Sequence, residues 1–419
     1  MADGVADLLN EARAEAYAMP LDQIDLSLPE RFRDNTIWPF FERIRNEDPI
    51  HYTAESPSGP HWSITKYNDI MAVETNHQVF SSASGISIDD PDDEDGPLPM
   101  FISMDPPKHD AQRKVVSPIV SPHNLANMEP IIRERAAKIL DELPIGEPFD
   151  WVDRVSVELT TQMLCTLFDF PFEDRRKLTR WSDIVTAGVD TDLVESREAA
   201  WEEIMECAAY FTNLWNQRVN AAVPGNDLIS MMANAEATKD MPPMEYLGNI
   251  LLLIVGGNDT TRNSLTGGLL ALHENPDQYR KLREHPELIP SMVSEIIRYQ
   301  TPVAHMRRTA KRDFEFHGQT IRQGEKVVMW YVSGNRDETA IDQPEAFLID
   351  RPRPRQHLSF GFGIHRCVGM RLAEMQLRVV WEEILERFPV VEVVEEPVRL
   401  KSCFLRAYRS MPVRIPARN

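Results

Sequence analysis

The sequence predicts a mainly α-helical protein with a small β portion. Helical periodicity of the apolar residues dominates from Asp105 to about His285. By contrast, residues 301–329 hold short β-type runs separated by turn signals, and residues 390–415 are again strand-like. No segment has the composition of a linker. We therefore expect one domain over residues 1–419, with β structure at about 50–80, 301–332 and 390–415.

The first distinct element along the chain is a long loop. Residues 81–104 are rich in Ser, Gly, Pro and Asp and contain an acidic run, which predicts an irregular, solvated segment that could cover a pocket. A helix is then expected to begin at Asp105, with this residue as its cap and Pro106 and Pro107 in its first turn. Further helices are expected at 130–143, 155–168, 199–221, 245–273, 292–299 and 368–388.

Composition argues against several classes of partner. The net charge of −21 disfavours binding to nucleic acid and to anionic membrane surfaces. The longest apolar run, at 250–255, is much shorter than the roughly 18 residues of a membrane helix, and the acidic N-terminus lacks a signal-peptide core. We therefore expect a soluble cytoplasmic protein without a membrane anchor. The cysteines are too widely spaced for a disulfide framework or a paired zinc site; they are Cys165, Cys207, Cys367 and Cys403.

The segment from Phe360 to Gly369 reads Phe-Gly-Phe-Gly-Ile-His-Arg-Cys-Val-Gly and carries the strongest chemical signal. Its glycines let the backbone approach a large flat group, and the helix expected after it would turn its positive end toward Cys367 and favour a thiolate. Such a thiolate can ligate haem iron and favour cleavage of the O–O bond. The alternatives are a buried structural cysteine and a zinc ligand, although no partner pair lies at zinc spacing.

Two further motifs lie on expected helices. In Gly256-Gly257-Asn258-Asp259-Thr260, the Thr260 hydroxyl can compete for the carbonyl of Gly256 and open the helix, making room for O₂ and water. A hydroxyl backed by a carboxylate is a plausible proton relay, but the segment alone could be a packing notch or a helix end. Glu295 and Arg298 lie one turn apart, and most such pairs are surface ion pairs.

The cysteine segment resembles the haem-binding loop of the cytochrome P-450 family, Phe-Gly-x-Gly-x-His-x-Cys-x-Gly, at every defined position. The resemblance implies the cytochrome P-450 fold, with heme b between the central long helix and the helix after the cysteine loop. It makes Cys367 the iron ligand, assigns Thr260 a hydrogen bond to the oxygen being activated and Asp259 a gate for protons, and makes Glu295 and Arg298 a buried structural pair. Arg307 is preferred to Arg308 by its spacing. The residues expected to bind the cofactor are His109, Arg113, Arg307 and His365 at the propionates, and Phe360, Gly361 and Gly369 in the loop.

A closer resemblance concerns the substrate. Residues 300–309 and 351–367 look like the bacterial subfamily of terminal alkane hydroxylases. This implies a monooxygenase acting at the end (omega) carbon of medium-chain alkanes or fatty acids, with an uncharged, mainly apolar pocket. The pocket positions that the resemblance implies are Leu252, Val255, Gly256, Val303, Phe404, Leu405, Leu98, Met100 and Ile102. Each could equally be ordinary core.

The electron donor is suggested by an excess of arginine in an acidic chain. Residues 351–378 contain Arg351, Arg353, Arg355, Arg366, Arg371 and Arg378 against one acid, Glu374. A basic patch here suits an acidic partner, although buried pairs and haem neighbours are expected to account for some of these arginines. The resemblance implies a ferredoxin with a nicotinamide-dependent ferredoxin reductase. The alternatives that stay open are a terpenoid or other compact hydrophobic substrate, a peroxide-driven peroxygenase and a non-catalytic haem protein that binds a ligand.

Overall fold

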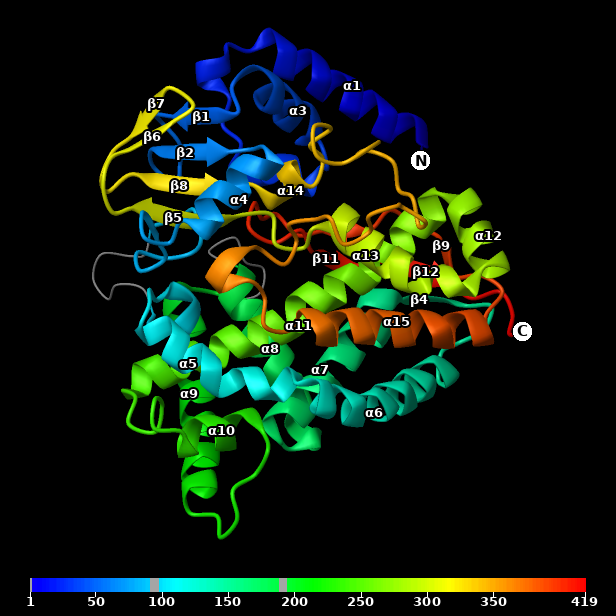
Figure 1. Cartoon of the computed structure of the whole chain (residues 1–419). Coiled ribbons are helices and arrows are strands. Elements are labelled where there is room, and N and C mark those ends of the chain that lie inside the picture. Colours follow the sequence, from blue (N-terminus) through cyan, green and yellow to red (C-terminus); the bar gives the residue numbers. More distant parts are fainter. Residues whose placement is uncertain (1, 91–97, 188–193) are drawn as a thin grey trace. The chain divides into compact units, whose positions relative to one another are not determined.

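The computed structural model describes residues 2–90, 98–187 and 194–419 and falls into two compact units (Figure 1). Unit 1 comprises Met1–Pro97, Ser294–Cys367 and Val398–Arg409, and unit 2 comprises Leu98–Val293, Val368–Pro397 and Ser410–Asn419. Each unit is described by itself below. The organisation of residues 1–419 as a single domain stays a prediction.

Unit 1 is built on a five-stranded sheet of order β1-β2-β8-β5-β3. The strands are β1 (Ile50–Thr53), β2 (His61–Ile64), β8 (Lys326–Met329), β5 (Met306–Ala310) and β3 (Phe80–Ser81). Strand β2 pairs with β8 in parallel, and the remaining neighbours are antiparallel. A separate hairpin of β6 (Phe314–Phe316) and β7 (Gln319–Ile321) turns at His317 and Gly318, both with positive φ. Two positive φ values define the turn that suits a two-residue hairpin loop, so this turn signal is confirmed.

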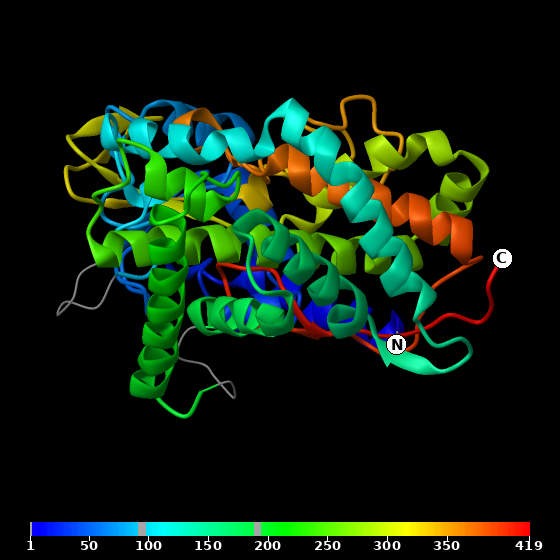
Figure 2. The same cartoon turned by 90° about the horizontal axis from the view of Figure 1, so that it is seen from below.

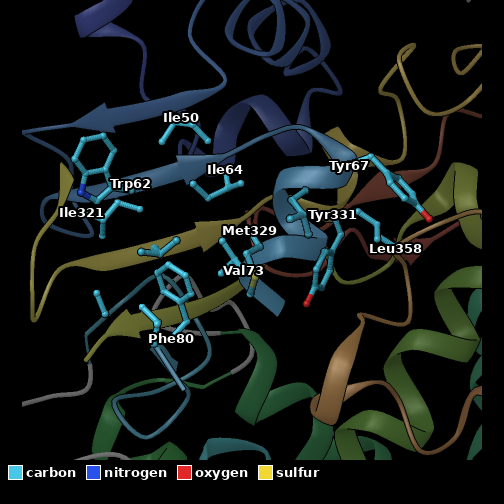
Figure 3. Packing of buried hydrophobic residues seen from close by; sticks show 14 of the residues in the cluster. Ile50, Trp62, Ile64, Tyr67, Val73, Phe80, Ile321, Met329, Tyr331 and Leu358 are labelled. Atoms are coloured by element: carbon cyan, nitrogen blue, oxygen red, sulfur yellow. The ribbon is translucent and has the colours of Figure 1, made fainter. Parts of the chain in front are cut away.

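Both faces of strand β8 are covered. Val327 and Met329 lie in one hydrophobic cluster with Ile70 and Val73 of helix α4 (Tyr67–Thr75) (Figure 3). Val328 of the same strand belongs to a second cluster, which includes residues of α1 (Ala2–Ala18) and α3 (Trp38–Glu47). Because side chains alternate along a strand, a strand buried on both faces is apolar at nearly every position. Unit 1 also contains α2 (Pro29–Arg33), α14 (Tyr331–Gly334), β10 (Val398–Arg399) and most of β11 (Tyr408–Ser410).

Unit 2 is helical, with α11 (Pro243–Glu274) packing against several of the other helices. Twenty-two of its 32 residues are buried, which fits a helix that is enclosed on most sides. Helix α15 (Met370–Arg387) packs against α6 (Pro122–Asp141), as Figure 2 shows. The other helices are α5 (Lys108–Val116), α7 (Glu158–Phe168), α8 (Arg175–Ala187), α9 (Arg197–Val219), α10 (Leu228–Asn234) and α12 (Pro276–Glu284), and α13 (Ile289–Gln300) runs from unit 2 into unit 1. A small sheet of order β4-β12-β9 joins Pro148–Asp150, Pro412–Arg414 and Glu392–Val393.

The mainly α prediction is confirmed, with two local differences. The helix expected from Asp105 begins only at Lys108, and its N-cap is Pro107, so Asp105 does not cap it. Strand β4 lies outside the expected β regions, because its partner β12 is far away in the sequence and the pairing leaves no local pattern. Of the long loop, residues 82–90 and 98–100 contain no helix or strand, Phe101–Ser103 forms one 3₁₀ turn, and residues 91–97 lie outside the described part of the chain. Among the described residues, no helix combines the length and apolar character needed to cross a bilayer.

Candidate active site

The loop before Cys367, in unit 1, needs its glycines. Gly361 and Gly363 have φ values of +65° and +66°, a conformation that side chains disfavour. A Cβ atom at Gly363 would also overlap the backbone carbonyl of Glu74. Within the loop, the backbone N–H of Cys367 donates to the carbonyl oxygen of Phe360 over 2.8 Å. Helix α15 begins at Met370, shortly after Gly369, as the sequence predicts.

Exposure separates Cys367 from the other cysteines. Of the four cysteines, all within the described residues, Cys367 alone is exposed. Burial raises the pKa of Cys165 to about 11 and that of Cys403 to about 12, and it raises the pKa of Cys207 further. These three therefore stay as thiols, and a buried structural role for Cys367 is wrong. The described residues contain no group of three or more His, Cys, Asp and Glu side chains that could hold a metal ion, so the zinc alternative has no support.

The Glu295–Arg298 pair is buried in unit 1. Arg298 Nε and Nη2 each donate to a different carboxylate oxygen of Glu295 over 2.8 Å, and neither side chain has exposed surface. Arg351 adds two more bonds to the same carboxylate, at 2.9 and 3.1 Å. Two guanidinium groups thus share one carboxylate, which fixes the chain around Leu348, whose N–H also donates to Glu295.

Arg351 therefore does not belong to an exposed basic surface and is one of the arginines used in a buried pair. Arg378 is also occupied, by Glu129 at 2.7 Å and Glu382 at 2.9 Å. Sequence alone does not separate these two arginines from the rest, because Glu295 and Glu129 lie far away in the chain and Glu382 lies one turn further along α15. The exposed members are Arg353, Arg355, Arg366 and Arg371.

The predicted propionate partners divide between the units. In unit 1, Arg307 Nη1 lies 2.7 Å from Asp90, and its Nε is buried without a hydrogen-bond partner among the described residues. This guanidinium thus keeps a donor for a carboxylate, as a haem propionate would require. The neighbouring Arg308 is paired with the buried Glu74 at 2.8 Å, so the preference for Arg307 agrees with the contacts.

The remaining donors are histidines and one more arginine. His365 Nε2 lies 3.1 Å from the Ser82 hydroxyl in unit 1. In unit 2, His109 and Arg113 lie one turn apart on α5, where His109 Nδ1 is 2.7 Å from Asp110 Oδ1 and Arg113 is half-buried. Each of the four expected positions therefore carries a cationic or hydrogen-bonding side chain of the kind that a propionate binds.

Helix α11 contains the predicted hydroxyl contact. Thr260 Oγ1 donates to the carbonyl oxygen of Gly256 over 3.0 Å, although the helix runs without a break from Pro243 to Glu274. A Cβ atom at Gly256 would meet nothing within 4 Å, whereas one at Gly257 would lie 2.7 Å from Leu164 Cδ2. Gly257 is thus the packing notch that the sequence left as an alternative, and Gly256 borders open space beside Thr260.

Asp259 lies on the buried side of α11, where two residues hold its carboxylate. Its Oδ2 accepts a hydrogen bond of 2.7 Å from the Ser182 hydroxyl of α8, and its Oδ1 pairs with Arg262. Arg262 also contacts Asp183 of α8 at 2.7 Å. Burial raises the pKa of Asp259, while Arg262 and Ser182 oppose this shift. Arg262 lies three residues after Asp259, and this helical spacing is a signal of the ion pair that sequence reasoning missed. Ser182 lies on another helix, so no sequence signal points to its contact with Asp259.

The predicted pocket residues are uncharged and mostly half-buried. Leu252, Val255, Gly256 and Thr260 form a partly exposed face of α11 in unit 2. In unit 1, Val303 forms a β-bridge with Leu405, which is itself buried, and the Phe404 ring lies 5.3 Å from the ring of His305. Leu98, Met100 and Ile102 are half-buried around the 3₁₀ turn.

Known proteins resemble the chain over most of its length. A family model described as cytochrome P450 matches residues 60–407. Linalool 8-monooxygenase of Pseudomonas putida is 35% identical over 405 residues, covering 94% of this chain and 99% of that protein. Methyl-branched lipid omega-hydroxylase of Mycobacterium tuberculosis is 33% identical over 387 residues, with coverages of 89% and 90%.

Two solved structures are more similar in sequence. Cytochrome P450-153 from Novosphingobium aromaticivorans is 45% identical with a TM-score of 0.86, covering 93% of this chain and 98% of that one. CYP153D17 from Sphingomonas sp. is 47% identical with a TM-score of 0.88, and the coverages are 94% and 100%.

Proposed function

The chain belongs to the cytochrome P450 family of haem-thiolate monooxygenases, and on this premise we propose that it hydroxylates the terminal carbon of medium-chain alkanes or fatty acids. The observation that carries the proposal is the resemblance of residues 300–309 and 351–367 to the terminal alkane hydroxylase subfamily. A relative named methyl-branched lipid omega-hydroxylase, 33% identical over 387 residues, supports the same type of reaction.

The cofactor of the family is haem with a cysteine thiolate ligand, which when bound supplies the activation of O₂ for insertion of one oxygen atom into a C–H bond. In the proposal, Cys367 provides the thiolate, and Phe360, Gly361 and Gly369 shape the loop around it. Four side chains would bind the propionates: His109, Arg113, Arg307 and His365. The buried Glu295–Arg298 pair, with Arg351, would hold the chain on which the loop depends.

Protons are the second requirement of the reaction. In the proposal, the Thr260 hydroxyl would leave the carbonyl of Gly256 to donate a hydrogen bond to the oxygen being activated, and Asp259 would gate the supply of protons from the buried side of α11. Asp259 must change its partner to do so, because Ser182 and Arg262 occupy both of its oxygens. A peroxygenase or a ligand-binding haem protein would have no evident need for this acid and alcohol pair.

Terminal attack needs positioning, because a primary C–H bond is stronger than a secondary one. A channel that admits only the end of a linear chain would meet this need by orientation. The residues proposed to line it carry no charge, which suits an apolar chain. They are Leu252, Val255, Gly256, Val303, Phe404, Leu405, Leu98, Met100 and Ile102.

The family takes electrons from redox partners, and we propose a ferredoxin for this chain. The exposed arginines Arg353, Arg355 and Arg366 in unit 1, and Arg371 at the start of α15, would attract an acidic donor. Electrons would reach the ferredoxin from a nicotinamide-dependent reductase.

A titration of the substrate-induced change in the haem absorbance tests the proposal. Alkanes and fatty acids of increasing length should give a clear affinity optimum at medium length, and product analysis should find the alcohol at the last carbon. Linalool serves as the competitor, because a 35% identical relative is named linalool 8-monooxygenase and favours the second candidate, a terpenoid substrate. Tighter binding and faster turnover of linalool than of any linear chain would replace the first candidate with the second.

A further inference from the structure

Unit 1 contains a second buried ion pair, which is separate from Glu295 and Arg298. Glu74, at the end of α4, accepts a hydrogen bond of 2.8 Å from Arg308 Nη2 on β5 and another from the Tyr331 hydroxyl on α14. The three residues are only 3%, 4% and 3% exposed. Tyr331 lies at the edge of the hydrophobic cluster around the sheet and turns its hydroxyl away from the strands (Figure 3).

This group of three residues lies directly behind the cysteine loop. A Cβ atom at Gly361 would come within 3.4 Å of both Glu74 Oε1 and the Tyr331 hydroxyl. A Cβ atom at Gly363 would overlap the backbone carbonyl of Glu74. Both glycines with positive φ in the loop therefore pack against Glu74. Gly361 packs against its side chain, and Gly363 packs against its backbone.

The contacts also show why a charged residue is used. A buried carboxylate is stable only when its charge is compensated, and a compensated pair fixes the positions of both partners more tightly than apolar contacts do. Arg308 supplies the charge from β5, and its Nη1 also donates to the carbonyl oxygen of Arg307 over 2.7 Å. Glu74 thus couples the loop, the sheet and the backbone of Arg307, which the proposed function places at a propionate.

We propose that Glu74, held by Arg308 and Tyr331, is a positioning residue that fixes the loop geometry of Gly361 and Gly363 and thereby keeps Cys367 bound to the haem iron as a thiolate. The inference rests on the proposed role of Cys367. It is independent of the substrate. It assigns to Glu74 no contact with the haem and no part in proton transfer.

The test compares haem-loaded Tyr331→Phe, Glu74→Gln and Asp69→Asn proteins with the wild type. Tyr331→Phe removes only one hydroxyl, so it keeps the inference testable where Glu74→Gln fails to fold. Asp69→Asn is the matched control, because Asp69 lies on the same helix and forms its own contact of 2.8 Å with His317, away from the loop. The measurement is the absorbance of the reduced carbon-monoxide complex, followed while the thiolate-type band converts to the thiol-type band during incubation. The unfolding temperature is recorded in parallel.

We expect the band to convert about tenfold faster in Tyr331→Phe, because one buried hydrogen bond to a charged group corresponds to at least that factor. Glu74→Gln should convert faster still, and Asp69→Asn should match the wild type. Unchanged conversion in Tyr331→Phe and Glu74→Gln would overturn the inference. So would a lower unfolding temperature with wild-type conversion, since that result indicates a structural role alone.

Cys367→Ser separates this inference from the proposed function. If Cys367→Ser loses the thiolate-type band and both Tyr331→Phe and Glu74→Gln convert as the wild type does, the ligand assignment stands and only the role of Glu74 is overturned. A thiolate-type band retained by Cys367→Ser would overturn the ligand assignment and the role of Glu74 together.

Discussion

The Thr260 hydroxyl donates a hydrogen bond of 3.0 Å to the carbonyl oxygen of Gly256, one turn earlier in α11. Breaking this bond should cost little free energy, because Gly256 borders open space and Thr260 is half-buried. The same hydroxyl can therefore turn toward a bound molecule without leaving a buried group unsatisfied. Asp259, the residue before Thr260, lies on a fully buried side of the helix.

Replacing Thr260 by alanine should uncouple electron use from product formation. Without the hydroxyl, proton delivery fails at the oxygen being activated, so reduced nicotinamide should be consumed at a similar rate while peroxide replaces the alcohol. The ratio of alcohol formed to nicotinamide consumed measures the effect. Ser264→Ala is the matched control, since Ser264 also donates to a carbonyl one turn earlier, that of Thr260, over 2.9 Å. Equal coupling in Thr260→Ala and Ser264→Ala would remove Thr260 from the relay.

The two adjacent glycines of α11 should respond differently to alanine. A methyl group at Gly257 meets Leu164 at 2.7 Å, so Gly257→Ala should lower the free energy of unfolding by about 1–3 kcal/mol. A methyl group at Gly256 has room, and alanine is a better helix former than glycine. Gly256→Ala should therefore not lower the free energy of unfolding as Gly257→Ala does. The new methyl group lies beside Thr260, however, so Gly256→Ala should weaken substrate binding in the absorbance titration. Denaturant unfolding measures the stability of both variants, and the absorbance titration measures their substrate binding. Equal losses of stability in Gly256→Ala and Gly257→Ala would contradict the assignment of Gly257 as the packing notch.

Arg351 and Arg353 lie two residues apart but should have different roles, since Arg351 stabilises the fold and Arg353 attracts the electron donor. Arg351→Ala leaves Glu295 with one of its two guanidinium partners and removes two hydrogen bonds to a buried charge, each worth about 1.5–3 kcal/mol, so haem-loaded protein should be scarce. Arg353 is exposed, so Arg353→Ala should leave the unfolding free energy unchanged and raise the ferredoxin concentration needed for half-maximal turnover, more so at low salt. A stable Arg351→Ala protein would show that the second guanidinium partner of Glu295 is dispensable.

His305 should make the protein sensitive to acid. Burial lowers the pKa of His305 to about 3 from its usual 6.5. Because the folded pKa is below the unfolded one, the unfolded chain takes up a proton first as the pH falls. Stability is therefore complete above pH 6.5 and is lost between about pH 6.5 and pH 3, at up to about 1.4 kcal/mol per pH unit.

His305→Gln removes this titration while an amide can still contact the N–H of Ile88 and the carbonyl oxygen of Cys403. The variant should lose stability at pH 8, and its disadvantage should shrink as the pH falls toward 5. Denaturant unfolding at several pH values measures the difference. Parallel curves for the two proteins would contradict a neutral, buried His305.

Features set by neighbouring residues could be predicted from the sequence. The Thr260–Gly256 bond and the Glu295–Arg298 pair follow from helical spacing, and the His317-Gly318 turn follows from residues that tolerate positive φ. The helix start at Asp105 was wrong, because the two prolines precede the helix instead of entering its first turn.

Contacts between distant segments could not be predicted, since they depend on how the fold brings those segments together. Ser182 reaches Asp259 from another helix, and Glu74 meets Arg308 across more than half of the chain. Arg351 could not be told apart from the surface arginines because its acidic partner, Glu295, lies 56 residues away. Periodicity reports that a residue is buried or exposed, but it does not identify the partner of a buried charge.

The most direct test of the account is the absorbance of the reduced carbon-monoxide complex of haem-loaded Cys367→Ser. Cys165→Ser is the control, because Cys165 is buried and its pKa is raised to about 11. If Cys367 is the haem ligand, Cys367→Ser should lose the thiolate-type band and all hydroxylation, while Cys165→Ser should keep the band. A thiolate-type band retained by Cys367→Ser would contradict the assignment of Cys367 as the haem ligand.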